Sequence, residues 1–168
     1  MFMKRQTSKT GQRPVCLCTN LRRTARAISN IYDAALAPTG IKITQFSLLR
    51  AVERNEPIAI SVLAEDMALD RTTLARNLAL LERDRLIDMS AGADQRVTEV
   101  RLTQAGRKAI EKAIPLWSDT QREVSRLLAP GRIEQLYDIS REASNAAEKF
   151  TASVEVPAKK RISKRSSR

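Results

Sequence analysis

Apolar and polar residues follow each other with helical spacing over much of this chain, and the pattern is densest in residues 60–102. Asp70 is a candidate cap for a helix in which Leu74, Leu78 and Leu81 recur at i, i+4 and i+7, the spacing of one buried face. The opposite face is polar and consists of Thr72, Thr73, Arg76 and Arg83. This helix therefore has the composition expected of one that contacts a polar partner.

A shorter helix should precede it, starting at a capping Ser61 and containing the apolar residues Val62, Leu63 and Met67. Residues 58–60 could form a third, edge strand, and the segments 87–89 and 98–102 alternate in polarity on either side of a turn at residues 91–94. The sequence thus predicts two short helices followed by a β-hairpin, or wing.

Helices are expected on both sides of this segment. One should run from Cys16 to Pro38 and another from a capping Thr44 through Val52 to a turn at residues 55–57. After the wing, a capping Thr103 should start a long helix that ends near Leu128. A last helix should end near Phe150. We expect a mainly α fold with a small β-hairpin wing, in which residues 43–102 form a winged helix-turn-helix domain and residues 15–42 and 103–151 form a helical dimerisation region. The terminal helices carry more apolar surface than a small winged domain can cover, which predicts a homodimer.

Composition fits a single globular domain, with 168 residues, 42% of them apolar and 29% charged. The net charge of +11 is concentrated at the two ends. Residues 1–14 and 152–168 are polar, cationic and without periodicity, and we expect both segments to be disordered. They could act as solubilising tails or add sequence-independent attraction to phosphates.

Several function classes are disfavoured. The chain has no His, no Gly-rich phosphate loop and no G-x-S-x-G motif, so an enzyme is not expected, and no cofactor is implied. Two Cys without His argue against a metal site. No apolar run approaches the roughly 20 residues needed to span a bilayer. The basic N-terminus lacks the apolar core of a secretory signal, so a cytoplasmic location is expected.

The order of elements and three sequence segments resemble the multiple-antibiotic-resistance regulator (MarR) family of winged helix-turn-helix repressors. The segments are ITQFSLLRAV at 43–52, LAEDMALDRTTLARNLALLERDRLI at 63–87 and DQRVTEVRLTQAG at 94–106. The last is the most specific, because the family pairs an Asp and an Arg two residues apart at the wing tip and follows them with a Leu-Thr-x-x-Gly helix start. The resemblance covers roughly residues 16–150.

This resemblance implies a regulator, most often a repressor, that binds a pseudo-palindromic site in double-stranded DNA. The groups on the polar helix face suit phosphates and base edges in a major groove, and Arg96 at the wing would reach the adjacent minor groove. Asp94 would hold Arg96 through a fork-shaped ion pair. The predicted DNA-binding residues are Arg71, Thr72, Thr73, Arg76, Asn77, Asp94, Gln95 and Arg96. For Arg76 and Arg83 the alternative is a solvated helix face paired with Glu82 or Asp84.

Control of such a regulator could act through Cys16 and Cys18. A free Cys is most often a small buried hydrophobe. The resemblance offers another interpretation, because the one-cysteine branch that senses organic hydroperoxides has its reactive Cys at the position of Cys18 and a thiolate-binding Tyr at the position of Tyr32. That branch has a second Tyr where this sequence has Arg22, although a nearby Arg would also favour a thiolate.

A small aromatic ligand is the other route to control. By resemblance, Arg22, Tyr32, Phe46, Leu49 and Trp117 could line a cavity between the dimerisation helices and the winged domain, although core packing is the simpler interpretation of Phe46 and Leu49. The sequence therefore predicts a homodimeric DNA-binding regulator released by a small molecule or by thiol oxidation. The alternative is a non-specific, nucleoid-type nucleic-acid-binding protein that uses its basic tails.

Overall fold

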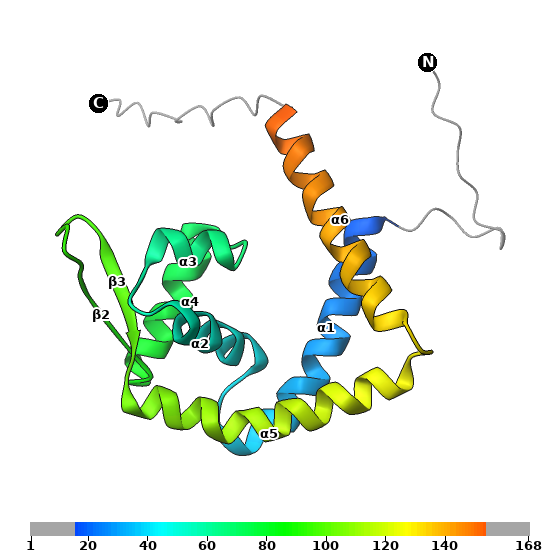
Figure 1. Ribbon diagram of the computed structural model, residues 1–168, viewed down its shortest axis with the longest axis horizontal. Coiled ribbons are helices and arrows are strands. Elements are labelled where there is room, and N and C mark those ends of the chain that lie inside the picture. The colour runs from blue at the N-terminus through cyan, green and yellow to red at the C-terminus, as the bar shows by residue number, and fades with distance from the viewer. Residues whose placement is uncertain (1–15, 154–168) are drawn as a thin grey trace, which may run out of the picture. The chain divides into compact units, whose positions relative to one another are not determined.

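The computed structural model of the protein describes residues 16–153, which are mainly helical (Figure 1). The elements in chain order are α1 (Leu17–Leu36), the 3-10 turn η1 (Ala37–Thr39), α2 (Ile43–Asn55), β1 (Ile58–Ala59), α3 (Ile60–Asp66), α4 (Arg71–Arg83), β2 (Ile87–Ala91), β3 (Thr98–Leu102), α5 (Gln104–Leu127) and α6 (Arg132–Ser153). The mainly α fold with a small wing is confirmed. The predicted disorder of residues 1–14 and of the C-terminal tail lies outside the described residues, except that α6 continues to Ser153, inside the segment expected to be tail.

The described part of the chain divides into two compact units between Arg122 and Glu123, so that α5 begins in the first unit and ends in the second. The boundary between these compact units, after Arg122, is not the same kind of boundary as the predicted one between a winged domain and a dimerisation region. The functional boundaries at residues 42 and 102 therefore remain a prediction.

The wing is a β-hairpin within a three-stranded antiparallel sheet of order β1-β3-β2. Val100 of β3 pairs with Ile58 on one side and Met89 on the other, so β3 is the central strand and β1 the predicted edge strand. The loop between β2 and β3 is longer than the turn that the sequence predicted and covers residues 92–97. The β2–β3 hairpin lies beside α3 and α4 (Figure 1).

The core of the first unit gathers around α4. Leu74, Leu78 and Leu81 are completely buried, as the i, i+4, i+7 spacing predicted. They belong to one apolar cluster with side chains of α2, the sheet and α5, including Leu49, Val100 and Ile110. One face of α4 is thus fixed against the body of the unit, and the opposite face remains exposed.

Two predicted helix caps are wrong. The residue before α3 is Ala59, and Ser61 lies inside the helix next to Val62, which is 52% exposed. At the start of α2 the flanking residue is Lys42, not Thr44. The first backbone amide of α2, that of Ile43, donates to Oδ1 of Asp33 in α1 over 2.7 Å. This free amide of α2 is thus satisfied by a carboxylate from another helix, which no local sequence pattern predicts.

The start of α5 is tied closely to the preceding turn. Oγ1 of Thr103 accepts the backbone N–H of Gly106 over 3.0 Å and donates to the carbonyl oxygen of Arg85 over 2.7 Å, which confirms Thr103 as a cap. The backbone N–H of Thr103 also donates to the carbonyl of Leu86 over 3.2 Å. A Cβ at Gly106 would lie only 2.0 Å from that carbonyl oxygen, so the helix approaches the turn at a distance that only glycine permits.

A single carboxylate connects α2, the wing and α5. Oε2 of Glu56 accepts the backbone N–H of Leu102 in β3 over 2.7 Å, and its other oxygen pairs with the guanidinium of Arg107 in α5. The Glu56 side chain is 17% exposed. The last residue of the wing and the first turns of α5 are therefore held by the same group.

Candidate nucleic-acid interface

The exposed face of α4 carries two arginines with no ion pair inside residues 16–153. Arg71 and Arg76 are both exposed and lie in the first half of the helix. Arg83, the last residue of the helix, instead pairs with Asp84 over 3.0 Å, which is the alternative interpretation given for it above. The available positive charge of α4 is therefore concentrated in its N-terminal half, the part of a recognition helix that contacts base edges.

Asp70 caps α4 as predicted, and it does so with both carboxylate oxygens. Oδ1 accepts the backbone N–H of Thr73 over 3.0 Å, and Oδ2 accepts the Thr73 hydroxyl over 2.6 Å. The hydroxyl of Thr73, followed by its N–H, lowers the pKa of Asp70, so the carboxylate stays charged at neutral pH. A DNA phosphate approaching this end of α4 would meet that negative charge.

The wing tip presents an arginine in a fixed orientation. Arg96 donates from Nε to Oδ1 of Asp94 over 3.1 Å and from Nη2 to Oδ2 over 3.0 Å, and its backbone N–H also donates to Oδ1. This is the fork-shaped pair that the sequence predicted, and Arg96 is the largest cause of the lowered pKa of Asp94. The Arg96 side chain is 90% exposed, and Gln95 beside it is exposed too. Asp94 orients Arg96 without burying it.

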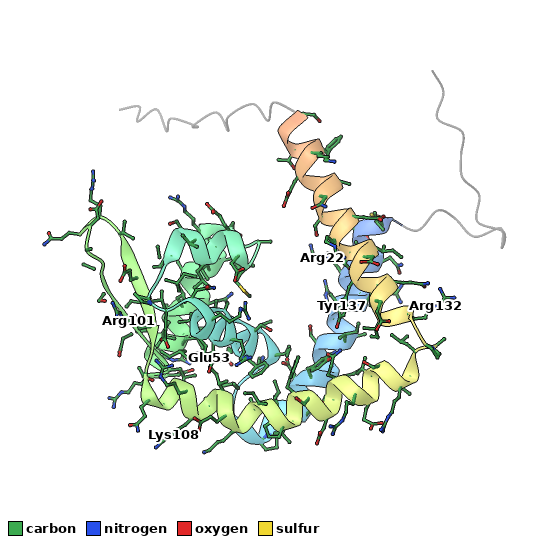
Figure 2. All side chains as sticks on the ribbon, in the orientation of Figure 1. Arg22, Glu53, Arg101, Lys108, Arg132 and Tyr137 are labelled. Carbon is green, nitrogen blue, oxygen red and sulfur yellow. The ribbon has the colours of Figure 1, made fainter. Side chains whose placement is uncertain are left out.

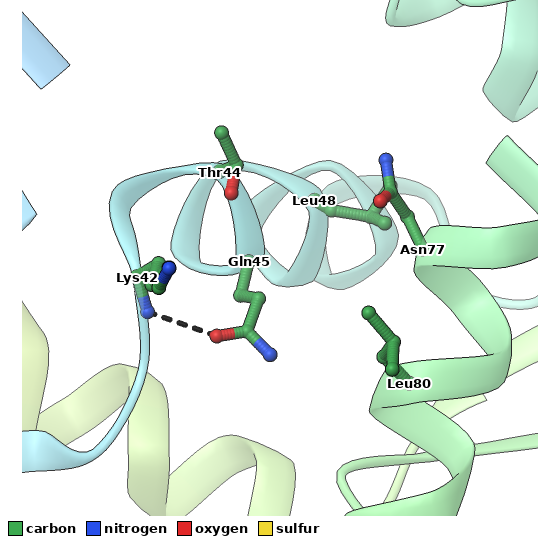
Figure 3. A pocket seen from close by; sticks show the side chains of 6 residues that line it. All are labelled: Lys42, Thr44, Gln45, Leu48, Asn77 and Leu80. Carbon is green, nitrogen blue, oxygen red and sulfur yellow. Dashed lines mark hydrogen bonds between the residues drawn. The ribbon is translucent and has the colours of Figure 1, made fainter. Parts of the chain in front are cut away.

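Asn77 and Leu80 lie on the flank of α4 that faces the start of α2. A cavity of about 200 Å³ lies between these helices (Figure 3), and Lys42, Thr44, Gln45 and Leu48 line it from the α2 side. Leu80, which points outward in the helical pattern, is 43% exposed at this cavity. Asn77 is thus only partly available to DNA. The sequence carried no signal for this cavity, because its walls come from segments about 30 residues apart.

The predicted ligand residues do not line that cavity. Phe46 is buried, and its ring packs against Trp117 with the centroids 5.9 Å apart. Tyr32 is also buried, and its hydroxyl donates to the side-chain oxygen of Gln121. Arg22 is exposed on α1 (Figure 2). Phe46, Trp117 and Tyr32 therefore pack α1, α2 and α5 together, with Leu49 completely buried as expected for a core residue.

Both cysteines are exposed, which contradicts the simple expectation of buried apolar thiols. Cys16 is the residue just before α1. Its pKa is lowered first by the backbone N–H of Thr19, then by the Thr19 hydroxyl and the N–H of Cys18. Cys18 and Tyr32 lie fourteen residues apart in the same helix, a separation of about 21 Å at 1.5 Å per residue. Within one chain these two side chains do not meet.

Within residues 16–153, no helix combines the length and apolar character required to cross a membrane. The same part of the chain holds no cluster of three or more metal-ligating side chains. The groups arranged for binding are instead the exposed hydroxyls and guanidinium groups of α4 and the oriented arginine of the wing. Hydroxyl and guanidinium groups recognise phosphates and base edges, so this surface is suited to double-stranded DNA.

Comparison with known proteins agrees with this geometry. Residues 39–96 match the model of the MarR family. The transcriptional regulator MosR of M. tuberculosis, solved in complex with DNA, is 37% identical to this chain, and the alignment covers 82% of this chain and 98% of MosR with a TM-score of 0.71. Comparison with curated protein sequences gives no match.

Two more distant structures share the fold. A mutant MarR from E. coli complexed with operator DNA is 20% identical, with 76% of this chain and 92% of that one covered and a TM-score of 0.69. BpsR from Bordetella bronchiseptica, whose DNA binding is regulated by 6-hydroxynicotinic acid, is 22% identical, with 77% and 93% covered and a TM-score of 0.69. With the α4 face, the oriented wing arginine and the match to MosR, the chain belongs to the MarR family of DNA-binding transcriptional regulators.

Proposed function

We propose that this chain acts in the cytoplasm as a homodimeric, sequence-specific repressor that binds a pseudo-palindromic operator and is released by thiol oxidation or by a small aromatic ligand. The observation that carries the DNA-binding part is the exposed face of α4, where Thr72 and Thr73 lie together with Arg71 and Arg76, which form no ion pair within residues 16–153. These side chains read DNA in a major groove, and Arg96 grips the adjacent minor groove.

Dimerisation is supported by apolar side chains that each unit leaves exposed. In the first unit α1 exposes Leu17 at 68% and Leu21 at 49%. In the second unit none of the described side chains of α6 is buried, and Tyr137, Ile139 and Phe150 are more than half exposed. An exposed apolar surface of this extent marks an interaction site, and a second copy of the chain is the commonest partner.

Footprinting on the DNA beside the protein's own coding sequence tests the proposal. A dimeric repressor should protect two half-sites one helical turn apart, at concentrations well below those needed to protect random DNA. A nucleoid-type protein that binds through basic tails would protect all sequences alike and show a steep salt dependence. Protection equal to that of random DNA would therefore rule out the specific repressor.

Thiol oxidation is the proposed route of release. A thiolate attacks a hydroperoxide, the O–O bond breaks, the sulfur keeps the hydroxyl as a sulfenic acid, and the alkoxide leaves and takes a proton from water. Cys18 is the reactive position by family resemblance. The lowered pKa of Cys16 makes this neighbour a second candidate for the attacking thiolate. Oxidation at Cys18, alone or onto Cys16 of another chain, would change the distance between the recognition helices of the dimer.

The thiol proposal is tested with Cys16→Ser and Cys18→Ser beside the wild type. Each protein is bound to the operator, treated with an organic hydroperoxide and followed by a DNA-shift assay. Wild type should be released, and the variant lacking the attacking thiol should remain bound. Equal release of both variants and wild type would contradict thiol control. Release by an aromatic acid such as 6-hydroxynicotinic acid, which regulates BpsR, would support the ligand route.

A further inference from the structure

Two neighbouring threonines on α4 differ in what their hydroxyl groups can still do. The Thr73 hydroxyl donates its proton to Oδ2 of Asp70 over 2.6 Å, and the Thr73 N–H donates to Oδ1 over 3.0 Å. A hydroxyl group has one proton and two lone pairs, so Thr73 retains only lone pairs for any other partner. The Thr72 hydroxyl makes no hydrogen bond to any residue in 16–153, and both its proton and its lone pairs are available.

Both threonines are exposed on the helix that reads DNA in the proposed function. In the major groove the only hydrogen-bond donors are the exocyclic amino groups, N4 of cytosine and N6 of adenine, whereas guanine and thymine present acceptors at O6, N7 and O4. Phosphate oxygens are acceptors too. A hydroxyl whose proton is already committed has nothing to donate to phosphate, guanine or thymine.

The carboxylate of Asp70 strengthens this selection. Both of its oxygens face Thr73, and its negative charge lies within hydrogen-bond distance of the Thr73 hydroxyl. A phosphate or a base acceptor placed against Thr73 would be repelled by that charge, whereas an amino group would be attracted. Among the described residues, Arg71 and Arg76 have no such carboxylate partner, so this acceptor character is local to Asp70 and Thr73.

We propose that Thr73 and Asp70 together read an exocyclic amino group of a base in the major groove, with Oγ1 of Thr73 as the acceptor and Asp70 fixing the direction of its proton. Asp70 is thus a specificity-determining residue as well as a helix cap. The inference rests on the proposed sequence-specific binding and assigns one base position of each half-site to cytosine or adenine.

The test begins by selecting the preferred duplex of the full-length protein from a random library. Each adenine of the selected half-site is then replaced by purine, and each cytosine by 2-pyrimidinone, which removes the amino group and leaves the ring. Binding is measured for wild type, Thr73→Val, Thr73→Ser and Thr72→Val, and the folding of each variant is checked by thermal unfolding. Val keeps the shape of Thr without the hydroxyl, and Ser keeps the hydroxyl without the methyl group.

At one position, loss of the amino group should weaken wild-type binding about 3- to 10-fold, the effect of one lost hydrogen bond. Thr73→Val should be insensitive to the same change, while Thr73→Ser and Thr72→Val should keep the wild-type sensitivity. The analogue that produces the effect identifies the base as adenine or cytosine. If Thr73→Val stays as sensitive as wild type at every position, or weakens binding equally for all sequences, the inference is wrong.

Asp70→Asn provides a sharper second measurement. Asn also caps helices well, and with its oxygen on the Thr73 N–H its amide nitrogen would donate to the Thr73 hydroxyl. The hydroxyl proton would then point outward, so selection with this variant should favour thymine or guanine at the same position. An unchanged preference would overturn the role of Asp70. If wild type selects no sequence at all, both this inference and the proposed function fail, whereas a selected site without coupling to Thr73 rejects the inference alone.

Discussion

The contact between Gly106 and the turn before β2 predicts an unusual response to a mild substitution. Replacing Gly by Ala within a helix normally stabilises it by about 1 kcal/mol. At Gly106 the added methyl carbon would lie 2.0 Å from the carbonyl oxygen of Leu86, where contacts under 3.0 Å are essentially never seen. The start of α5 must therefore move away from the turn by about 1 Å, a figure set by those two distances.

That movement would disturb the hydrogen bonds from Thr103 to the carbonyls of Leu86 and Arg85, each contributing about 1 kcal/mol. Overpacking adds about 1–3 kcal/mol. After the helix propensity is subtracted, Gly106→Ala should lower the free energy of unfolding by about 2–4 kcal/mol. In a chain of this length, the melting temperature should fall by about 5–15 °C.

Thermal unfolding followed by circular dichroism measures the effect. Lys108→Ala, at an exposed position in the same helix, is the matched control and should change stability by less than about 0.5 kcal/mol. A Gly106→Ala protein that melts at or above the wild-type temperature would refute the reasoning, because helix propensity would then outweigh the contact.

Three further predictions concern the DNA-binding surface and its charges. Arg96→Ala should weaken operator binding about tenfold by loss of the wing contact, and Asp94→Asn should weaken it less, because Arg96 stays but loses its orientation; titration of labelled operator measures both. Arg76→Ala should change base preference as well as affinity, at about 1–3 kcal/mol per specific base contact, when its preferred duplex is selected from a random library. Arg83→Ala should change neither base preference nor affinity in that assay, because the Arg83 side chain already pairs with Asp84. The carboxyl of Asp94 should titrate below the usual Asp range by NMR. Because its pKa is lowered in the folded state, the stabilisation from its ion pair is present above the unfolded pKa and is lost as the pH falls through the folded pKa. A titration midpoint at or above the usual Asp range would contradict the ion pair.

Local periodicity was sufficient to predict most of the winged segment. The spacing of Leu74, Leu78 and Leu81 predicted the buried face of α4, because a helix packed on one side needs apolar residues at that spacing. Alternation of apolar and polar residues predicted the hairpin, because successive side chains of a strand point to opposite faces. The fork between Asp94 and Arg96 was also predictable, because the two partners lie two residues apart and need no tertiary information.

Features that depend on distant partners were not predictable. Thr44 has the chemistry of a cap, yet Asp33 of α1 supplies the carboxylate at the start of α2. The resemblance paired Cys18 with Tyr32, but the uninterrupted helix α1 separates them within one chain. Local sequence gives the chemistry of a side chain, whereas its partner depends on how the helices pack.

The carboxylate of Glu56 has a mechanical consequence. By accepting the N–H of Leu102 and pairing with Arg107, it fastens the end of the wing strand to the first turns of α5, and no loose hinge is left between them. A change in the direction of α5, whatever its origin, is then not absorbed at this junction. The hairpin then rotates together with α5, and Arg96, at the far end of the hairpin, moves further than the residues at the junction.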